Sequence, residues 1–278
     1  MVFDYGYITR KVTYFENSFI IGRTVQNRNI YCIPIGNGKI FAVFAAAFHG
    51  LEYLTSPALL SFAEEYKKYT EYHDKIKIFI IPMVNPDGVD IAIHGIDPTN
   101  QYHQDIIKYT GIINFTSRWQ ANSMGVDINH NFDADWNSIF NKPSPSKYGG
   151  KYPESEPETR AIVKFLRKAK PELFIAFHSQ GKEIYYDFNG LENKKSKSTA
   201  EKIADCCGYT AAIPTGTASF GGAKDWFIKE FHKQAFTVEL GTGKNPLPDT
   251  QLPFMKEDTI KICFTAIDEI LKDKKDVI

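Results

Sequence analysis

Short apolar segments recur along the chain and predict buried strands. They consist mostly of aliphatic and aromatic residues, without the polar alternation of a strand that has one face in water. Four such segments stand out: residues 39–48, 76–84, 173–177 and 235–240. A sheet built from them is therefore expected to be covered on both faces.

Segments with the apolar spacing of helices lie between and after these strands. They span residues 57–69, 156–168, 223–232 and 255–272. Ser155 stands three residues before Glu158, as in a capping box, which predicts the start of the second helix. Strands that alternate with helices favour an α/β fold with a mostly parallel sheet. No repeat, low-complexity tract or linker divides the chain, so we expect a single domain over residues 1–278.

Composition excludes several classes of partner. The 278 residues are 43% hydrophobic, enough for a sizeable core, and 33 basic residues balance 33 acidic ones. A neutral chain has no overall field to recruit nucleic acid or an anionic membrane surface, so neither is expected as a partner. The first residues lack the plan of a secretion signal, and no apolar run approaches the roughly 18 residues of a membrane span. We therefore expect a cytoplasmic protein without an obligate protein partner, with a spore or envelope compartment as the alternative.

Residues that bind metals or transfer protons cluster at the ends of the predicted strands. The first strand runs into His49 and Glu52, the third into His178, and the fourth contains Glu239. Functional groups gather beyond the carboxyl ends of parallel strands, so these side chains are expected to meet. Two histidines and one glutamate with an open fourth position are typical ligands of a catalytic zinc ion. Glu239 would then take a proton from the water that the zinc activates.

Each of these residues by itself also has an ordinary structural explanation. A single histidine at a strand end is more often hydrogen-bonded than metal-bound, and a histidine three residues from a glutamate is common. Their recurrence at one edge of one predicted sheet strengthens the metal hypothesis. Glu239 adds to it, because a carboxylate within the apolar run AFTVEL is costly to bury unless a cation, a partner or a raised pKa compensates.

Seven segments resemble motifs of the zinc carboxypeptidase family and follow the family's order. They are HGLE at 49–52, PMVNPDGVD at 82–90, GVDINHNFDADW at 125–136, SEPET at 155–159, HSQG at 178–181, GGAKDWF at 221–227 and VELGTGKNPLP at 238–248. The resemblance covers nearly the whole chain. It implies a mixed, twisted eight-stranded sheet between helices and one bound Zn²⁺ ion.

The resemblance also assigns roles to individual residues. Three positions match the family's zinc ligands: His49, Glu52 and His178. Glu239 matches the general base. Asp127 matches a carboxylate that hydrogen-bonds the first zinc histidine, which fixes the ring's tautomer and orientation. Asn129 matches an asparagine that contacts a substrate carboxylate.

Three positions depart from the family's pattern. The family's carboxypeptidases grip the terminal carboxylate of the substrate with an arginine, and this chain has His130 there, which cannot form the same planar fork. The arginine that stabilises the oxyanion corresponds to Gln120, a neutral donor, although Arg118 lies two residues away. The tyrosine that closes over bound substrate corresponds to Thr217. These changes weaken the expectation of an ordinary C-terminal exopeptidase.

Lys224 falls at the position that lines the floor of the family's specificity pocket, where a cation selects an anionic substrate group. The alternative is a surface lysine at a helix start, since lysines are mostly exposed. Within the family, the segments around Lys224 and Asn129 look most similar to bacterial γ-D-glutamyl-meso-diaminopimelate peptidases. Substrates of those enzymes carry extra carboxylates, which Lys224 and His130 could meet.

The sequence therefore predicts a zinc peptidase that hydrolyses the amide between γ-D-glutamate and meso-diaminopimelate, or lysine, in peptidoglycan stem peptides. The first alternative is a conventional zinc carboxypeptidase that releases acidic C-terminal residues. A substrate with a blocked C-terminus separates these two, because only an exopeptidase needs the free terminus. The second alternative is a peptide-binding protein of the same fold that has lost turnover, although all four core residues are present.

Overall fold

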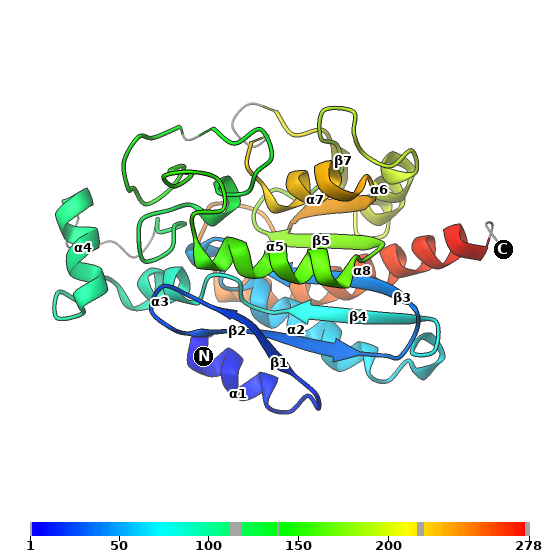
Figure 1. Cartoon of the computed structure of the whole chain (residues 1–278). Coiled ribbons are helices and arrows are strands. Elements are labelled where there is room, and N and C mark those ends of the chain that lie inside the picture. Colours follow the sequence, from blue (N-terminus) through cyan, green and yellow to red (C-terminus); the bar gives the residue numbers. More distant parts are fainter. Residues whose placement is uncertain (1, 112–117, 138, 216–219, 276–278) are drawn as a thin grey trace.

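An eight-stranded mixed sheet forms the centre of the fold (Figure 1). The computed structural model describes residues 2–111, 118–137, 139–215 and 220–275. The strands are β1 (Phe19–Arg23), β2 (Asn29–Ile35), β3 (Ile40–Ala46), β4 (Ile76–Ile81), β5 (Leu173–His178), β6 (Glu183–Tyr185), β7 (Thr210–Ala212) and β8 (Gln234–Glu239). They lie in the order β1-β2-β4-β3-β5-β8-β6-β7. The mixed eight-stranded sheet implied by the family resemblance is confirmed.

The apolar segments predict the central strands correctly. β4, β3, β5 and β8 pair in parallel, and successive residues of β3 pack into different cores. Phe44 belongs to the core on one face of the sheet, whereas Val43 and Ala45 belong to the core on the other. The search for apolar segments does not predict the outer strands β1, β6 and β7. β1 is largely exposed, and β6 and β7 have only three residues each.

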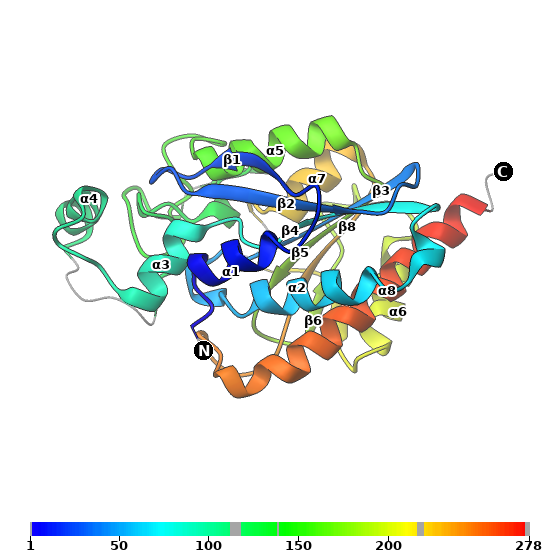
Figure 2. The same cartoon turned by 90° about the horizontal axis from the view of Figure 1, so that it is seen from below.

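Helices cover both faces of this sheet. They are α1 (Tyr5–Val12), α2 (Thr55–Tyr66), α3 (Pro86–His94), α4 (Gln101–Thr110), α5 (Pro157–Ala169), α6 (Ser196–Asp205), α7 (Ala223–Phe231) and α8 (Leu252–Lys275), with short 3₁₀ turns η1 (Gly50–Glu52), η2 (Thr70–Tyr72), η3 (Ile128–His130) and η5 (Asp249–Gln251). Figure 2 shows α5 and α7 on one side of the sheet and α1, α2 and α8 on the other. Over the described ranges, we find no helix with the length and hydrophobicity of a transmembrane segment.

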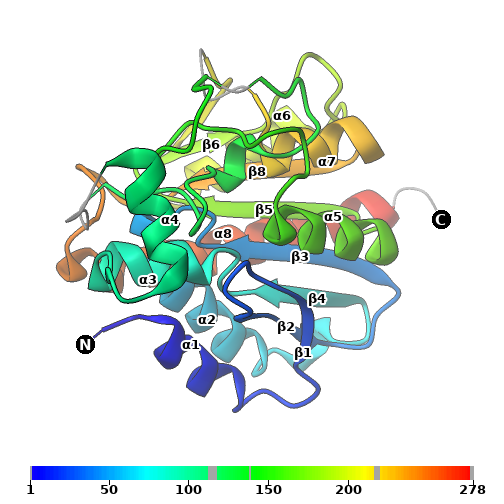
Figure 3. The same cartoon turned by 60° about the vertical axis from the view of Figure 1, so that its left-hand side comes forward.

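The register of the strands brings the predicted metal-binding and catalytic residues to one end of the sheet. His178 and Glu239 are the last register pair between β5 and β8. Ala46, at the end of β3 and three residues before His49, lies beside Phe177. Figure 3 shows α3 and α4 together toward the viewer. Residues far apart in the sequence therefore meet where the parallel strands end.

The start of α5 differs from the predicted capping box. α5 begins at Pro157 with Glu156 as its N-cap, and no side chain caps it. Ser155 donates its hydroxyl to Glu156 instead. Glu158 accepts hydrogen bonds from distant parts of the chain, among them the side chain of Asn122. The capping-box prediction is wrong because these tertiary contacts engage the Glu158 carboxyl group.

Buried Glu158 is expected to make stability depend on pH. Its side chain is fully buried, and burial, together with the charge of Asp87, raises the pKa of Glu158 from 4.5 to about 8. Because the folded-state pKa is raised, the stabilising contribution is complete below about pH 4.5 and is lost as the pH rises through about 8. Glu158→Gln, a neutral isostere of the protonated acid, should be free of this loss.

Urea unfolding at pH 5 and pH 8 measures this effect. Between the two pH values, the wild type should lose roughly 3 kcal/mol of unfolding free energy relative to Glu158→Gln. An equal difference between the two proteins at both pH values would show that Glu158 does not hold a proton in the folded state.

Candidate active site

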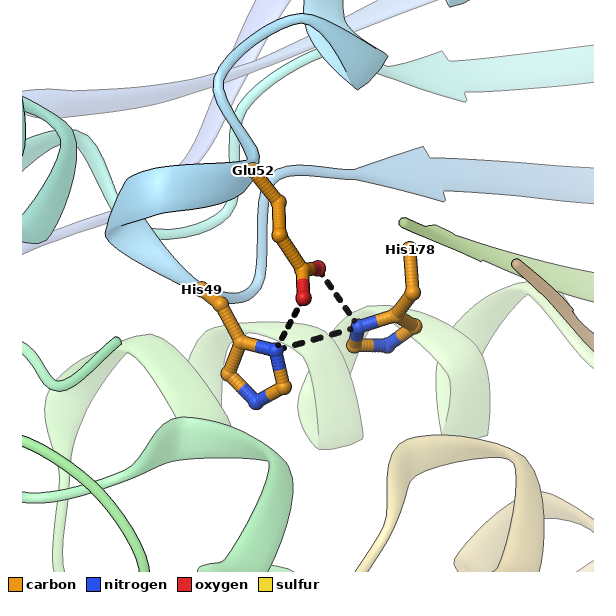
Figure 4. Close-up of side chains that lie close together, drawn as sticks. All are labelled: His49, Glu52 and His178. Atoms are coloured by element: carbon orange, nitrogen blue, oxygen red, sulfur yellow. Dashed lines mark hydrogen bonds and ion pairs between the residues drawn. The ribbon is translucent and has the colours of Figure 1, made fainter. Parts of the chain in front are cut away.

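Three side chains point toward one another at the carboxyl end of the sheet (Figure 4). His49 precedes η1, Glu52 ends it, and His178 is the last residue of β5. His49 Nδ1 lies 2.9 Å from Glu52 Oε1, and His178 Nδ1 lies 2.9 Å from Glu52 Oε2. The two Nδ1 atoms are 3.3 Å apart. The predicted metal ligands thus form a group that could hold one ion.

The hydrogen bonds of His49 indicate a cation among these side chains. Its Nε2 lies 3.1 Å from Asp127 Oδ1, and since an ionised carboxylate only accepts, Nε2 carries a proton. In the neutral ring, Nδ1 then turns a lone pair toward Glu52 Oε1, which is unfavourable unless a proton or a metal ion lies between them. The 3.3 Å between the two Nδ1 atoms is also about the ligand separation of a tetrahedral site with zinc–nitrogen bonds of about 2.0–2.1 Å. Donor set and spacing therefore fit Zn²⁺.

The pKa shifts within this group also favour a positive charge among the three side chains. Burial alone would raise the pKa of Glu52, but His49 and His178 lower it to about 2. Burial lowers the pKa of His178. For His49, the carboxylates of Glu52 and Asp127 outweigh burial and raise the pKa well above its usual value. The cluster thus attracts a positive charge, which a proton supplies when no metal ion is bound.

Asp127 connects the predicted metal ligands to a neighbouring loop. Its Oδ1 is the partner of His49 Nε2 and also accepts from the backbone N–H of Asn129. Its Oδ2 accepts from the backbone N–H of Lys147 at 2.9 Å. Asp127 is almost fully buried. These contacts are those expected of a residue that fixes the tautomer and orientation of a metal-bound histidine.

Glu239 and Gln120 line the same cleft as the metal ligands. The cleft has a volume of about 200 Å³. Glu239 is half-buried, and burial, with the charge of Glu52 nearby, raises its pKa well above the usual value. Gln120 is half-buried on the cleft wall, whereas exposed Arg118 is absent from the described residues of that wall. Position therefore favours Gln120 over Arg118 as a donor inside the cleft.

Asn129 and His130 are oriented by the segment that leads into α7. Asn129 Oδ1 accepts from the backbone N–H of Ala223 at 3.1 Å, which leaves its NH₂ group for a ligand. His130 Nδ1 lies 2.9 Å from the carbonyl oxygen of Phe220. The backbones meet closely at Gly221, which has φ +72°, and a Cβ there would lie 2.6 Å from the carbonyl oxygen of His130. Glycine is thus needed at that position to bring the segments together.

Lys224 is a buried residue of the cleft. Only 3% of it is exposed, so its interpretation as a surface lysine is wrong. Its ammonium group donates to the carbonyl of Asp187 and lies 2.6 Å from Asp225 Oδ1. The positive charge of Lys224 is therefore largely neutralised by groups of the protein itself. Thr217, predicted to replace a substrate-covering tyrosine, lies outside the described residues.

Sequence reasoning missed several residues of the cleft. Lys147, Tyr185 and Asp225 also line it. Tyr185 lies on β6, which pairs antiparallel with β8, and its hydroxyl donates to Glu183. A three-residue strand carries too little periodicity to be recognised. For Lys147 and Asp225, no local pattern signals that they lie beside the metal ligands.

Comparisons with known proteins show relatives along almost the whole chain. Residues 16–262 match a family model described as zinc carboxypeptidase. Gamma-D-glutamyl-L-diamino acid endopeptidase 1 of Lysinibacillus sphaericus is 32% identical over 264 residues, which cover 89% of this chain and 66% of that protein. Carboxypeptidase B of Bos taurus is 28% identical over 271 residues, which cover 86% of this chain and 62% of that protein. The chain thus spans about two thirds of the length of these relatives.

Solved structures share the fold. Bovine thrombin-activatable fibrinolysis inhibitor superimposes with a TM-score of 0.76 at 20% identity, covering 97% of this chain and 96% of that one. Murein-tripeptide amidase MpaA of Escherichia coli gives a TM-score of 0.62 at 17% identity, covering 92% and 95%. At these identities, the likeness concerns the fold alone.

Proposed function

The chain belongs to the zinc carboxypeptidase family, and we propose that it hydrolyses the amide between γ-D-glutamate and meso-diaminopimelate, or lysine, in peptidoglycan stem peptides. The name of the similar protein of Lysinibacillus sphaericus specifies a bond between γ-D-glutamate and an L-diamino acid. The family uses zinc, and the converging side chains of His49, Glu52 and His178 fit that ion. The proposal concerns the bond that is cut and the residues that cut it.

The bonding of His130 carries the proposal. A carbonyl oxygen only accepts, so His130 Nδ1 must donate a hydrogen to Phe220. That leaves Nε2, which can present at most one N–H to a ligand and cannot form the bidentate pair that an arginine makes with a carboxylate. A C-terminal exopeptidase relies on a cationic clamp for the terminal carboxylate, and this position lacks the arginine that would provide it. Loss of the clamp favours cleavage of a bond defined by other groups, as in a γ-linked stem peptide.

Four further residues of the cleft have a role in the proposed reaction. When bound, zinc lowers the pKa of a coordinated water and polarises the scissile carbonyl. Glu239 accepts a proton as the water attacks and returns it to the leaving amine. The Gln120 amide donates to the oxygen that becomes negative. Asn129 turns its NH₂ group toward the substrate, and Asp127 keeps His49 in its metal-binding orientation.

A conventional carboxypeptidase for acidic residues is the second candidate, because Lys224 places a cation in the cleft. Pairing with Asp225 weakens this candidate, since much of the lysine's charge is already neutralised. The third candidate, a binding protein without turnover, has no observation in its favour. The three predict different products from one set of peptides.

The test is cleavage of defined peptides by the zinc-loaded protein, followed by mass spectrometry. The substrates are L-Ala-γ-D-Glu-meso-diaminopimelate, its C-terminally amidated analogue and an ordinary α-linked peptide with an acidic C-terminus. We expect release of diaminopimelate, free or amidated, from both stem peptides and little turnover of the third. Intact stem peptides together with release of the acidic residue would establish the carboxypeptidase instead.

A further inference from the structure

We propose that Lys147 binds a substrate carboxylate that flanks the scissile amide. The inference deepens the proposed function and rests on it, because it identifies the group that recognises an anionic stem peptide. Lys147 lies in the connection between α4 and α5, outside all of the motifs that resemble the zinc carboxypeptidase family.

The backbone of Lys147 is tied to the metal site. Its N–H donates to Asp127 Oδ2 at 2.9 Å, and the Asp127 N–H donates to the carbonyl of the next residue, Tyr148, at 2.8 Å. Asp127 in turn contacts His49 through its other carboxylate oxygen. The exposed Lys147 side chain therefore starts from a fixed point on the rim of the cleft that also contains Glu239.

The backbone of Lys147 has a left-handed conformation. Its φ is +64°, in the left-handed region, where a residue with a Cβ is less stable than glycine by roughly 1 kcal/mol. The bonds to Asp127 hold this conformation in place. This conformation, which Lys170 and Lys182 share, thus helps to fix the point from which the Lys147 side chain starts.

The two lysines of the cleft differ in what their ammonium groups contact. Lys224 is buried and lies 2.6 Å from Asp225 Oδ1. Lys147 is exposed, and no described residue lies within hydrogen-bond or ion-pair distance of its ammonium group. Asp127 does not neutralise it, because the Asp127 carboxylate is engaged by His49 and by two backbone N–H groups. Lys147 is therefore the cation of the described cleft wall whose charge is available to a ligand.

The chemistry of a γ-linked peptide matches this arrangement. Because D-glutamate is joined through its side chain, its α-carboxylate stays free beside the scissile amide, and the diamino acid carries further carboxylates. Asn129 offers only a neutral amide, and the Nδ1 of His130 is engaged by the carbonyl of Phe220. A flexible ammonium with three donors on the rim can meet a carboxylate at this point. Lys147 thereby supplies a positive charge to a carboxylate beside the scissile amide, without rebuilding the bidentate clamp that an arginine makes for a free C-terminus.

The experiment compares Lys147→Met, Lys147→Arg and the control Lys142→Met, all loaded with zinc. Lys142 is an exposed lysine of the same connection that does not line the cleft. The substrates are the stem tripeptide and two analogues. One analogue has the α-carboxylate of D-glutamate replaced by an amide, and the other has the α-carboxylate of diaminopimelate replaced by an amide. Lys147→Met should raise KM about 10-fold with kcat within about twofold, as loss of one charged hydrogen bond predicts. Lys147→Arg and Lys142→Met should stay within about threefold of wild type.

The amidated analogues identify the carboxylate. Lys147→Met should have no effect on the analogue whose bound carboxylate has been amidated, because the interaction is already absent there. An unchanged KM for all three substrates would overturn the proposal. So would a fall in kcat of equal size for all three, which would place Lys147 at the developing oxyanion.

Binding without turnover separates this inference from the proposed function. Calorimetry on zinc-loaded Glu239→Gln, with and without Lys147→Met, measures the Kd for each intact peptide. If stem peptides are not cleaved but Lys147→Met weakens binding of an anionic peptide about 10-fold, the proposed function is wrong and the role of Lys147 stands. If stem peptides are cleaved and Kd does not change, the function stands and Lys147 has no such role.

Discussion

Replacing Glu239 with glutamine is expected to lower kcat by about 10²–10⁴-fold, the range typical for loss of a general acid–base group. Glutamine keeps the size of the side chain but cannot accept and return a proton. The position of Glu239 beside His178 in the sheet, half-buried in the cleft, should be preserved. Zinc content near one ion per chain, measured by mass spectrometry of the metal, would show that the site itself is intact.

The matched control for Glu239 is Glu183→Gln. Glu183 is the cross-strand neighbour of Glu239 on β6, and its carboxylate accepts from Tyr185. Removing its charge leaves the carboxyl group of Glu239 in place and takes away only one of the charges that raise the pKa of Glu239, so kcat should fall by less than about 10-fold. Similar losses for both variants, or a fully active Glu239→Gln, would be incompatible with Glu239 as the base.

Replacing His178 with alanine is expected to remove zinc and, with it, peptidase activity. His178 Nδ1 converges with His49 Nδ1 on the Glu52 carboxylate. If a zinc binding free energy of roughly 10–16 kcal/mol is shared among four ligands, losing one costs about 3–4 kcal/mol, or about 10²–10³-fold in affinity. Competition with a chromophoric chelator measures this change directly, and activity should fall to that of the metal-free wild type.

His130→Ala is the matched control for metal binding. His130 lines the same cleft, but its Nδ1 contacts the Phe220 carbonyl and not the metal ligands. Its zinc affinity should therefore equal that of the wild type, whatever happens to substrate binding. Wild-type zinc affinity in His178→Ala would mean that the ion is held elsewhere.

The central strands and the grouping of His49, Glu52 and His178 could be predicted from the sequence. Long apolar runs have few alternatives to a strand buried on both faces, and a parallel sheet aligns the carboxyl ends of such strands. His178 and Glu239 therefore had to lie close to each other, and they form the last register pair of β5 and β8. His49 joins them from 129 residues away because β3 lies next to β5 in the sheet.

Local sequence was insufficient where several distant segments compete for one side chain. The pattern at Ser155 and Glu158 resembles a capping box, yet Glu158 is bonded to remote parts of the chain and carries a raised pKa. The burial of Lys224 beside Asp225 was likewise undecidable from a helix start alone. In both cases, local patterns predict a charged residue at the surface, and contacts with distant parts of the chain bury it instead.

The sequence by itself determined the fold class, because long apolar runs predict buried strands, and its ordered motifs identified the family and the three side chains that form a group able to hold a metal ion. Tertiary structure alone decided which nitrogen of His130 is bonded to Phe220, which cleft lysine pairs with Asp225, and how the backbone of Lys147 is bonded to Asp127. Those bonds join loops whose conformations depend on distant partners rather than on a local repeat. The strands therefore position the predicted metal ligands and the proposed base, and the loops position the residues of the proposed substrate selectivity.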